Sequence, residues 1–150
     1  MRTTENLLAV LCLLVAACGG AGTTPTSPET AKTAWKDMTG SQKAVFMEKQ
    51  VVPKMGGVFS QFDPKQFEKV TCKTCHGARA KSGDFKMPNP DLPKLSTAGG
   101  FKKHLDAKPE MTKFMMEKVV PDMAGILGMP PYNPETHQGF GCFGCHTEEK

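Results

Sequence analysis

Two stretches of the chain carry apolar residues at helical spacing. An apolar side chain recurs every four residues over 47–59 and again over 115–127. This spacing puts each set on one stripe of an amphipathic helix that faces a core. Pro109 suits the first turn of the second helix, and Gly128 suits its end. The pattern predicts a mostly α fold.

The two predicted helices belong to an internal repeat. Phe46–Gly57 aligns with Phe114–Gly125 at an offset of 68, and both copies contain V-V-P-x-M. Pro53 and Pro121 cannot donate a hydrogen bond in a helix interior, where a proline costs roughly 3 kcal/mol, so we expect both helices to kink. A kink in both copies suggests that it serves the same purpose in each, namely to position the methionine two residues after the proline. The chain therefore contains two equivalent helical units.

Four cysteines form two identical motifs, one after each helix. They are Cys72-Lys73-Thr74-Cys75-His76 and Cys142-Phe143-Gly144-Cys145-His146. The pattern C-x-x-C-H attaches haem c, because the two thiols add across the two vinyl groups and the histidine binds the iron. We therefore predict two haem c groups, each packed within one helix-then-haem unit. The attachment residues are Cys72, Cys75, Cys142 and Cys145, and the iron ligands are His76 and His146.

Two other chemistries use cysteine pairs at this spacing. A zinc ion takes four cysteines or a mixture of cysteine and histidine, but 66 residues separate Cys75 from Cys142, more than the usual ribbon spacing. Disulfides or a thioredoxin-like redox pair would suit an exported chain. However, no βαβ pattern surrounds either pair, and that motif needs no histidine. Both remain alternatives to haem.

The repeat also suggests the sixth iron ligands. Met55 and Met123 each lie two residues after the repeated proline, 17 and 19 residues before the first cysteine of the next motif. Thioether sulfur is an iron ligand in c-type cytochromes, so we predict that these two methionines bind iron. Met47 and Met115 are the second pair of candidates. Core packing is the alternative role for all four, because methionine fills irregular gaps.

Other candidates have no counterpart in the repeat. His104 could bind either iron, but its lysine-rich surroundings predict an exposed histidine. His137 is five residues before Cys142, too close along the chain to reach the far side of that haem. Met129, in Gly128-Met129-Pro130, resembles the ligand loop of small monohaem cytochromes. In those proteins the loop follows the haem motif, whereas here it precedes one. Residues 87–93 are rich in proline and predict an extended loop that covers the first haem.

The N-terminal residues have the features of an export signal. Leu7–Ala17 is an apolar run of 11 residues, too short to cross a bilayer. Val15-Ala16-Ala17 before Cys18 resembles the lipobox of bacterial lipoproteins, so residues 1–17 would be removed and Cys18 would be lipidated. An ordinary secretory signal is the alternative. Residues 18–33 are small, polar and rich in proline, as in a flexible tether.

The remainder, 34–150, has the length of one domain with two units, about 41–97 and 98–150. Aromatic residues make up only 7% of the chain, which has 15 glycines and 12 prolines, so we expect haem to help fill the core. The formal charge of +4 does not indicate an acidic partner, because two haems bring four propionates, about −4. Export excludes nucleic acid as a partner.

A lipobox, helix-borne methionines and a C-x-x-C-H after each helix together resemble the cytochrome subunit of bacterial photosynthetic reaction centres. The resemblance covers about 46–76 and 114–146. It implies that Met55 and Met123 are sixth ligands, since that family uses the helix methionine upstream of each motif. The family has four such units and this chain two, so the resemblance extends to the units and not to the partner. Gly19, by resemblance to Gram-negative lipoproteins, favours the outer membrane.

These features predict an electron carrier. With histidine and methionine on each iron, no position is left for peroxide or oxygen. We therefore expect single electrons to pass between redox protein partners at the periplasmic side of a bacterial membrane. One alternative is a dihaem peroxidase-like enzyme in which one iron is open. A haem-based sensor is a weaker alternative, because the sequence shows no output domain.

Overall fold

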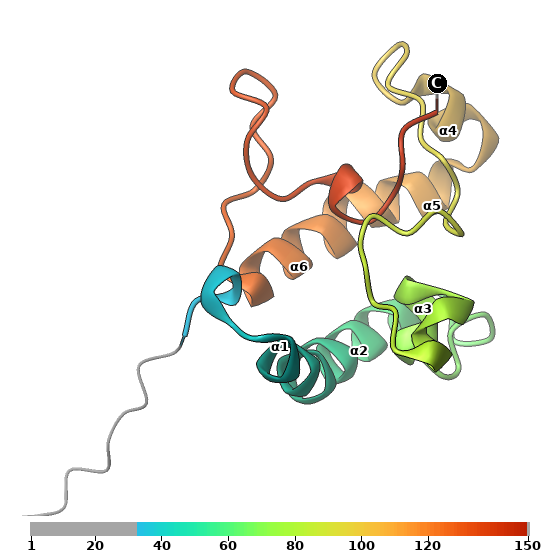
Figure 1. The fold of residues 1–150 in the computed structure, drawn as a ribbon. Coiled ribbons are helices and arrows are strands. Elements are labelled where there is room, and N and C mark those ends of the chain that lie inside the picture. The colour runs from blue at the N-terminus through green and yellow to red at the C-terminus, as the bar shows by residue number, and fades with distance from the viewer. Residues whose placement is uncertain (1–32, 150) are drawn as a thin grey trace, which may run out of the picture. The chain divides into compact units, whose positions relative to one another are not determined.

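Helices and connecting loops make up the part of the protein that the structure describes. The computed structural model describes residues 33–149 (Figure 1). Within that range it has helices and isolated β-bridges but no strand, which confirms the predicted mostly α class. No helix there is long and apolar enough to cross a membrane. The predicted signal peptide, Cys18 and the tether up to residue 32 lie outside the described residues.

The first long helix contains the first copy of the repeat. It consists of α1 (Gly40–Phe46), a π-turn η2 (Met47–Val51) and α2 (Val52–Phe62). Thr39 caps its start with a reciprocal pair of bonds: Gln42 N–H donates to Thr39 Oγ1, and Thr39 N–H donates to Gln42 Oε1. This capping box satisfies amide groups that no helical carbonyl reaches.

The second long helix contains the second copy. It consists of α5 (Pro109–Phe114), a π-turn η4 (Met115–Val119) and α6 (Val120–Leu127). Pro109 lies in the first turn, where its missing N–H costs nothing, and Gly128 ends the helix with a φ of 64°. Both ends agree with the positions expected from the sequence.

A π-turn accommodates the repeated proline in each helix. Val52 N–H donates to Met47 O, and Val120 N–H donates to Met115 O, so each turn is one residue wider than an α-turn. The α-helical segment that resumes after the π-turn has the proline in its first turn. A first-turn proline needs no N–H donor, so the penalty expected for a proline within an α-helix does not apply in full.

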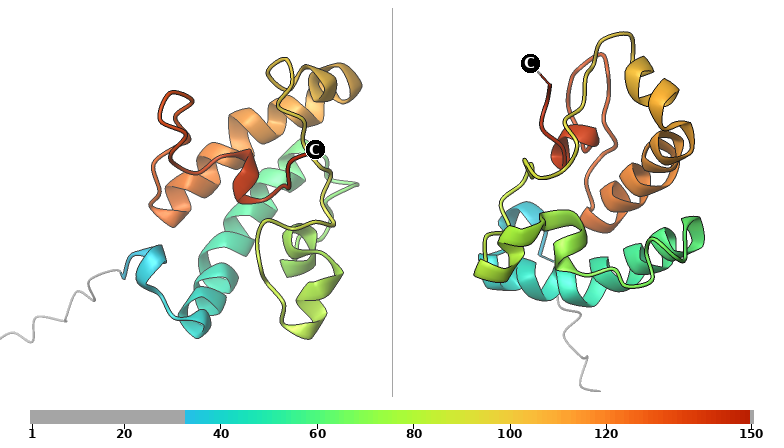
Figure 2. Two further views of the ribbon diagram at one scale, coloured as in Figure 1. Left: turned by 45° about the horizontal axis from the view of Figure 1, so that its top comes forward. Right: turned by 90° about the vertical axis from the view of Figure 1, so that its right-hand side faces the viewer.

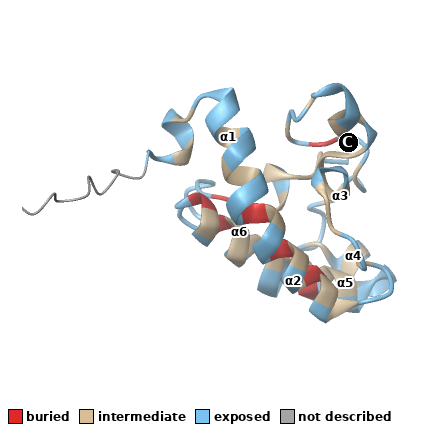
Figure 3. Cartoon of the chain, turned by 90° about the horizontal axis from the view of Figure 1, so that it is seen from below, coloured by how far each residue is buried: buried red, intermediate tan, exposed pale blue. Residues whose placement is uncertain are grey.

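The two long helices pack side by side through apolar residues (Figure 2). The first cluster contains Val51, Met55, Phe59 and Phe114. Phe114 meets Phe59 edge to face at 5.3 Å between ring centroids and stacks on Phe62 at 4.1 Å. The second cluster contains Ala124, Leu127 and Phe140. Buried segments follow the facing sides of α2 and α6 (Figure 3).

The remaining elements are short. They are η1 (Trp35–Asp37), α3 (Cys72–His76), η3 (Ala78–Ser82), α4 (Lys102–Ala107) and η5 (Cys142–Gly144). Only seven apolar side chains are buried within residues 33–149, a small core for a domain of that length.

Candidate cofactor site

The first motif lies on the short helix α3. A single helical turn puts Cys72 and Cys75 on the same side of the helix, three residues apart. The helix ends at Gly77, where φ is 70° and ψ is −163°, a conformation that essentially only glycine adopts. α3 therefore presents two thiols together and places the histidine where the chain turns away.

His76 is held beside an aromatic ring. Its imidazole meets Phe85 edge to face, with ring centroids 5.3 Å apart. Burial lowers the pKa of His76 and Arg79 lowers it further, while the Phe85 carbonyl raises it by less than burial lowers it. The neutral imidazole is therefore favoured, which is the form that binds a metal.

The second motif lies on the single turn η5. Cys145 N–H and His146 N–H both donate to Cys142 O, at 3.1 and 2.9 Å. The Phe140 ring packs directly over this turn, and a Cβ added at Gly144 would lie 2.8 Å from a ring carbon. The middle of the motif therefore needs glycine because an aromatic side chain approaches its backbone closely.

The orientation of His146 is set by a carbonyl. Its Nδ1 lies 2.8 Å from Pro93 O. A carbonyl oxygen only accepts, so Nδ1 carries a hydrogen and Nε2 is the ring nitrogen left to bind a metal. Histidines that bind metals are commonly held by such a bond to their other ring nitrogen. Pro93 thus orients the His146 ring so that Nε2 is the nitrogen an iron ion would use.

The buried thiols have raised pKa values. Burial raises the pKa of Cys75 and of Cys142, and it raises that of Cys145 to about 12, with further contributions from Cys75 and Cys142. The two motifs lie near each other, because Asn89 makes hydrogen bonds to both Cys75 O and Cys145 O, at 2.9 and 2.8 Å. A redox-active C-x-x-C pair instead has a lowered thiol pKa, so these values do not favour a thioredoxin-like site.

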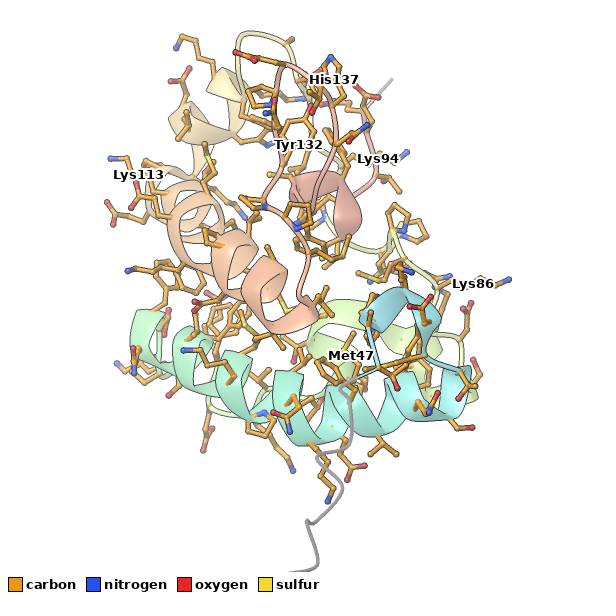
Figure 4. All side chains as sticks on the ribbon, turned by 90° about the vertical axis from the view of Figure 1, so that its left-hand side faces the viewer. Met47, Lys86, Lys94, Lys113, Tyr132 and His137 are labelled. Carbon is orange, nitrogen blue, oxygen red and sulfur yellow. The ribbon has the colours of Figure 1, made fainter. Side chains whose placement is uncertain are left out.

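The candidate methionines lie on the interior stripe. Met55 is 2% exposed and belongs to the first cluster, whereas Met115 is partly buried and packs against that cluster. Met47 and Met123 pack against both clusters, and Cys145 packs against the second. Figure 4 shows Met47 on the side of the first helix that faces the domain. The second motif therefore has two methionines on its side of the core.

The other candidates have different surroundings. His104 is half-buried rather than exposed, because its Nε2 accepts the Ser96 N–H at 2.9 Å and so holds a loop against α4. His137 is exposed, with Nδ1 2.8 Å from the Tyr132 hydroxyl, in a loop that projects from the helices (Figure 4). Met129 is 37% exposed. None of the three lies on the interior stripe of either long helix.

The sequence did not indicate that the loop after the first motif pairs with the second. Residues 89–95, here called the strap, run beside residues 145–149 (Figure 1). Leu95 N–H donates to Thr147 O, and Glu149 N–H donates to Leu95 O, both at 2.9 Å. The predicted extended loop is therefore part of the support of the second motif.

Gly77→Ala should destabilise the fold more than Gly83→Ala. A Cβ at Gly77 would lie 2.7 Å from Asp91 Oδ2 and 3.1 Å from Asn89 Nδ2, and its φ and ψ would add about 1–3 kcal/mol of backbone strain. Gly83 also has a positive φ, 78°, but open space around it, so alanine there costs about 1–2 kcal/mol. Chemical unfolding of both variants measures the difference. Equal losses would contradict the packing of the strap on Gly77.

Known proteins add no functional information to that of the two motifs. No protein-family model matches the chain, and neither does a curated protein or a solved structure. Within residues 33–149, no three histidine, cysteine, aspartate or glutamate side chains gather as they would around a metal ion. A C-x-x-C-H turn needs no such group, because its thiols bind the porphyrin and only the histidine binds iron.

Proposed function

We propose that the protein is a dihaem c-type cytochrome that passes single electrons between redox proteins. The observation that carries this proposal is the pair of neighbouring C-x-x-C-H turns, both bonded to Asn89, one of which has its histidine held through Nδ1 by Pro93 O. The thiol pairs, the adjacent histidines and the apolar cluster against which Cys145 packs fit haem c. Haem bound there would supply one-electron chemistry through its ferric and ferrous states.

Each unit contributes the same set of side chains. In each unit two cysteines would form thioethers to the haem, and a histidine and a helix methionine would be the side chains that bind its iron. These residues are Cys72, Cys75, His76 and Met55 in the first unit and Cys142, Cys145, His146 and Met123 in the second. The apolar clusters around the methionines exclude water, and a thioether ligand favours ferrous iron, so both effects raise the reduction potential.

The proposed location is the periplasmic side of a bacterial membrane, with the outer membrane favoured. Lipidated Cys18 would be the anchor, and residues 19–33 would let the domain reorient near the surface. A donor and an acceptor protein are the partners that such a carrier requires. With both axial positions of each iron filled, the chain would act as a carrier and not as an enzyme.

A haem count tests the proposed function. The full chain, produced in a bacterium with cytochrome c maturation machinery, should contain two covalently bound haems per chain by the alkaline pyridine assay. The reduced absorption spectrum should be that of haem c. A purified chain with no covalent haem would contradict the proposal, and stoichiometric zinc in that product would support the zinc alternative.

A further inference from the structure

Asn89 makes hydrogen bonds to both cysteine motifs. It is the one fully buried polar side chain within residues 33–149, at 0% exposure. Its Nδ2 donates to Cys75 O at 2.9 Å, and its backbone N–H donates to Cys145 O at 2.8 Å. A single residue thus binds the second cysteine of each motif through that cysteine's carbonyl.

The amide of Asn89 has a fixed orientation. Arg79 Nη2 donates to Asn89 Oδ1 at 3.2 Å, and Asp91 N–H donates to the same oxygen at 3.0 Å. Arg79 is itself paired with Asp84 at 3.0 Å. Guanidinium and amide N–H groups only donate and the Cys75 carbonyl only accepts, so these partners settle which end of the amide is oxygen.

The strap continues from Asn89 along the second motif. Pro93 O accepts from His146 Nδ1, and Leu95 pairs with Thr147 and Glu149. A displacement of Asn89 would therefore move α3 and the 145–149 segment relative to each other. Because Asn89 is buried, water cannot readily replace its side chain, and loss of the Nδ2 bond leaves the partly buried Cys75 carbonyl without this donor.

Resting on the proposed function, we propose that Asn89 is a positioning residue that sets the coupling between the two haem groups. It acts through Cys75 and Cys145, the cysteines whose carbonyls it binds and whose side chains would carry one thioether each. Electron tunnelling and magnetic interaction both weaken steeply with separation. The backbone N–H of Asn89 holds Cys145 and its side chain holds Cys75, so the side-chain bond ties the first attachment point to the second and controls how strongly the two redox centres interact.

The test compares Asn89→Ala with the wild-type holoprotein. Haem content is measured by the pyridine assay, and interaction between the two ferric centres is measured by electron paramagnetic resonance relaxation. We expect two haems per chain in both proteins, with a loss of magnetic interaction in the variant. Asn89→Asp keeps the acceptor but removes the donor to Cys75 O, so it gives the same readout if the alanine variant does not accumulate.

Asn133→Ala is the matched control. Asn133 is an exposed asparagine whose Oδ1 also accepts two backbone N–H groups, from Glu135 and Thr136, but it contacts neither motif. The Asn133→Ala holoprotein should retain the wild-type magnetic interaction between the two ferric centres. Two haems with unchanged interaction in the Asn89 variants would overturn this inference and leave the proposed function standing. A wild type without haem would instead overturn the proposed function.

Discussion

Replacing both cysteines of one motif with alanine should reduce covalent haem from two groups per chain to one. Cys72 with Cys75, and Cys142 with Cys145, supply the only thiols of their motifs, so removing a pair leaves no attachment point. The pyridine assay counts haem per chain. Haem staining of denaturing gels shows which product keeps a covalent group.

Lys73→Ala is the control for this experiment. Lys73 lies inside the first motif and is exposed, at a position where C-x-x-C-H accepts any residue. It should therefore keep two haems. A double-cysteine variant that also keeps two haems would show that haem is not attached at that motif.

Met55→Leu and Met123→Leu should each remove one haem's share of the weak red charge-transfer band of ferric His/Met haem. Leucine nearly conserves volume, so each change should cost less than about 1.5 kcal/mol of stability and leave the haem attached. Met55→His or Met123→His should lower that haem's reduction potential, because imidazole stabilises ferric iron relative to a thioether. Spectra and redox titrations measure both effects, and the other haem should change little.

Met47→Leu and Met115→Leu are the matched controls on the same helices. Both should keep the band and lose only packing. Met47→Leu is the sharper control, because Met47 packs against the same cluster as Cys145 and Met123. If Met47→Leu loses the band while Met55→Leu keeps it, the iron ligand is Met47, two helical turns away from the proposed ligand Met55.

Local features of the sequence predicted the helices well. Apolar spacing identified both interior stripes, and Pro109 and Gly128 marked the ends of α5–α6, because these signals depend on residues within one or two turns. The π-turns were not predicted. A proline shows that an α-helical hydrogen bond is missing, but not whether the helix bends or gains a residue to accommodate it.

The support around the motifs depends on contacts between distant residues. The two C-x-x-C-H motifs are recognisable because their chemistry fixes the spacing of three residues. The roles of Asn89 and Pro93 have no such spacing, since each binds a residue that is far away in the sequence. His104 shows the same limit, because its neighbours are lysines while its hydrogen-bond partner, Ser96, lies in a preceding loop.

The pairing of the strap with residues 145–149 also joins two segments that are synthesised at different times. His146 follows Pro93 by 53 residues, so during translation the strap leaves the ribosome well before its partner segment. Closing a flexible loop of that length costs about 3–4 kcal/mol of chain entropy, which the packed α5–α6 helix reduces by shortening the flexible part. Closure is therefore easier once this helix has formed. The segment that carries the second motif is thus completed by a long-range closure onto the strap, which the first half of the chain supplies.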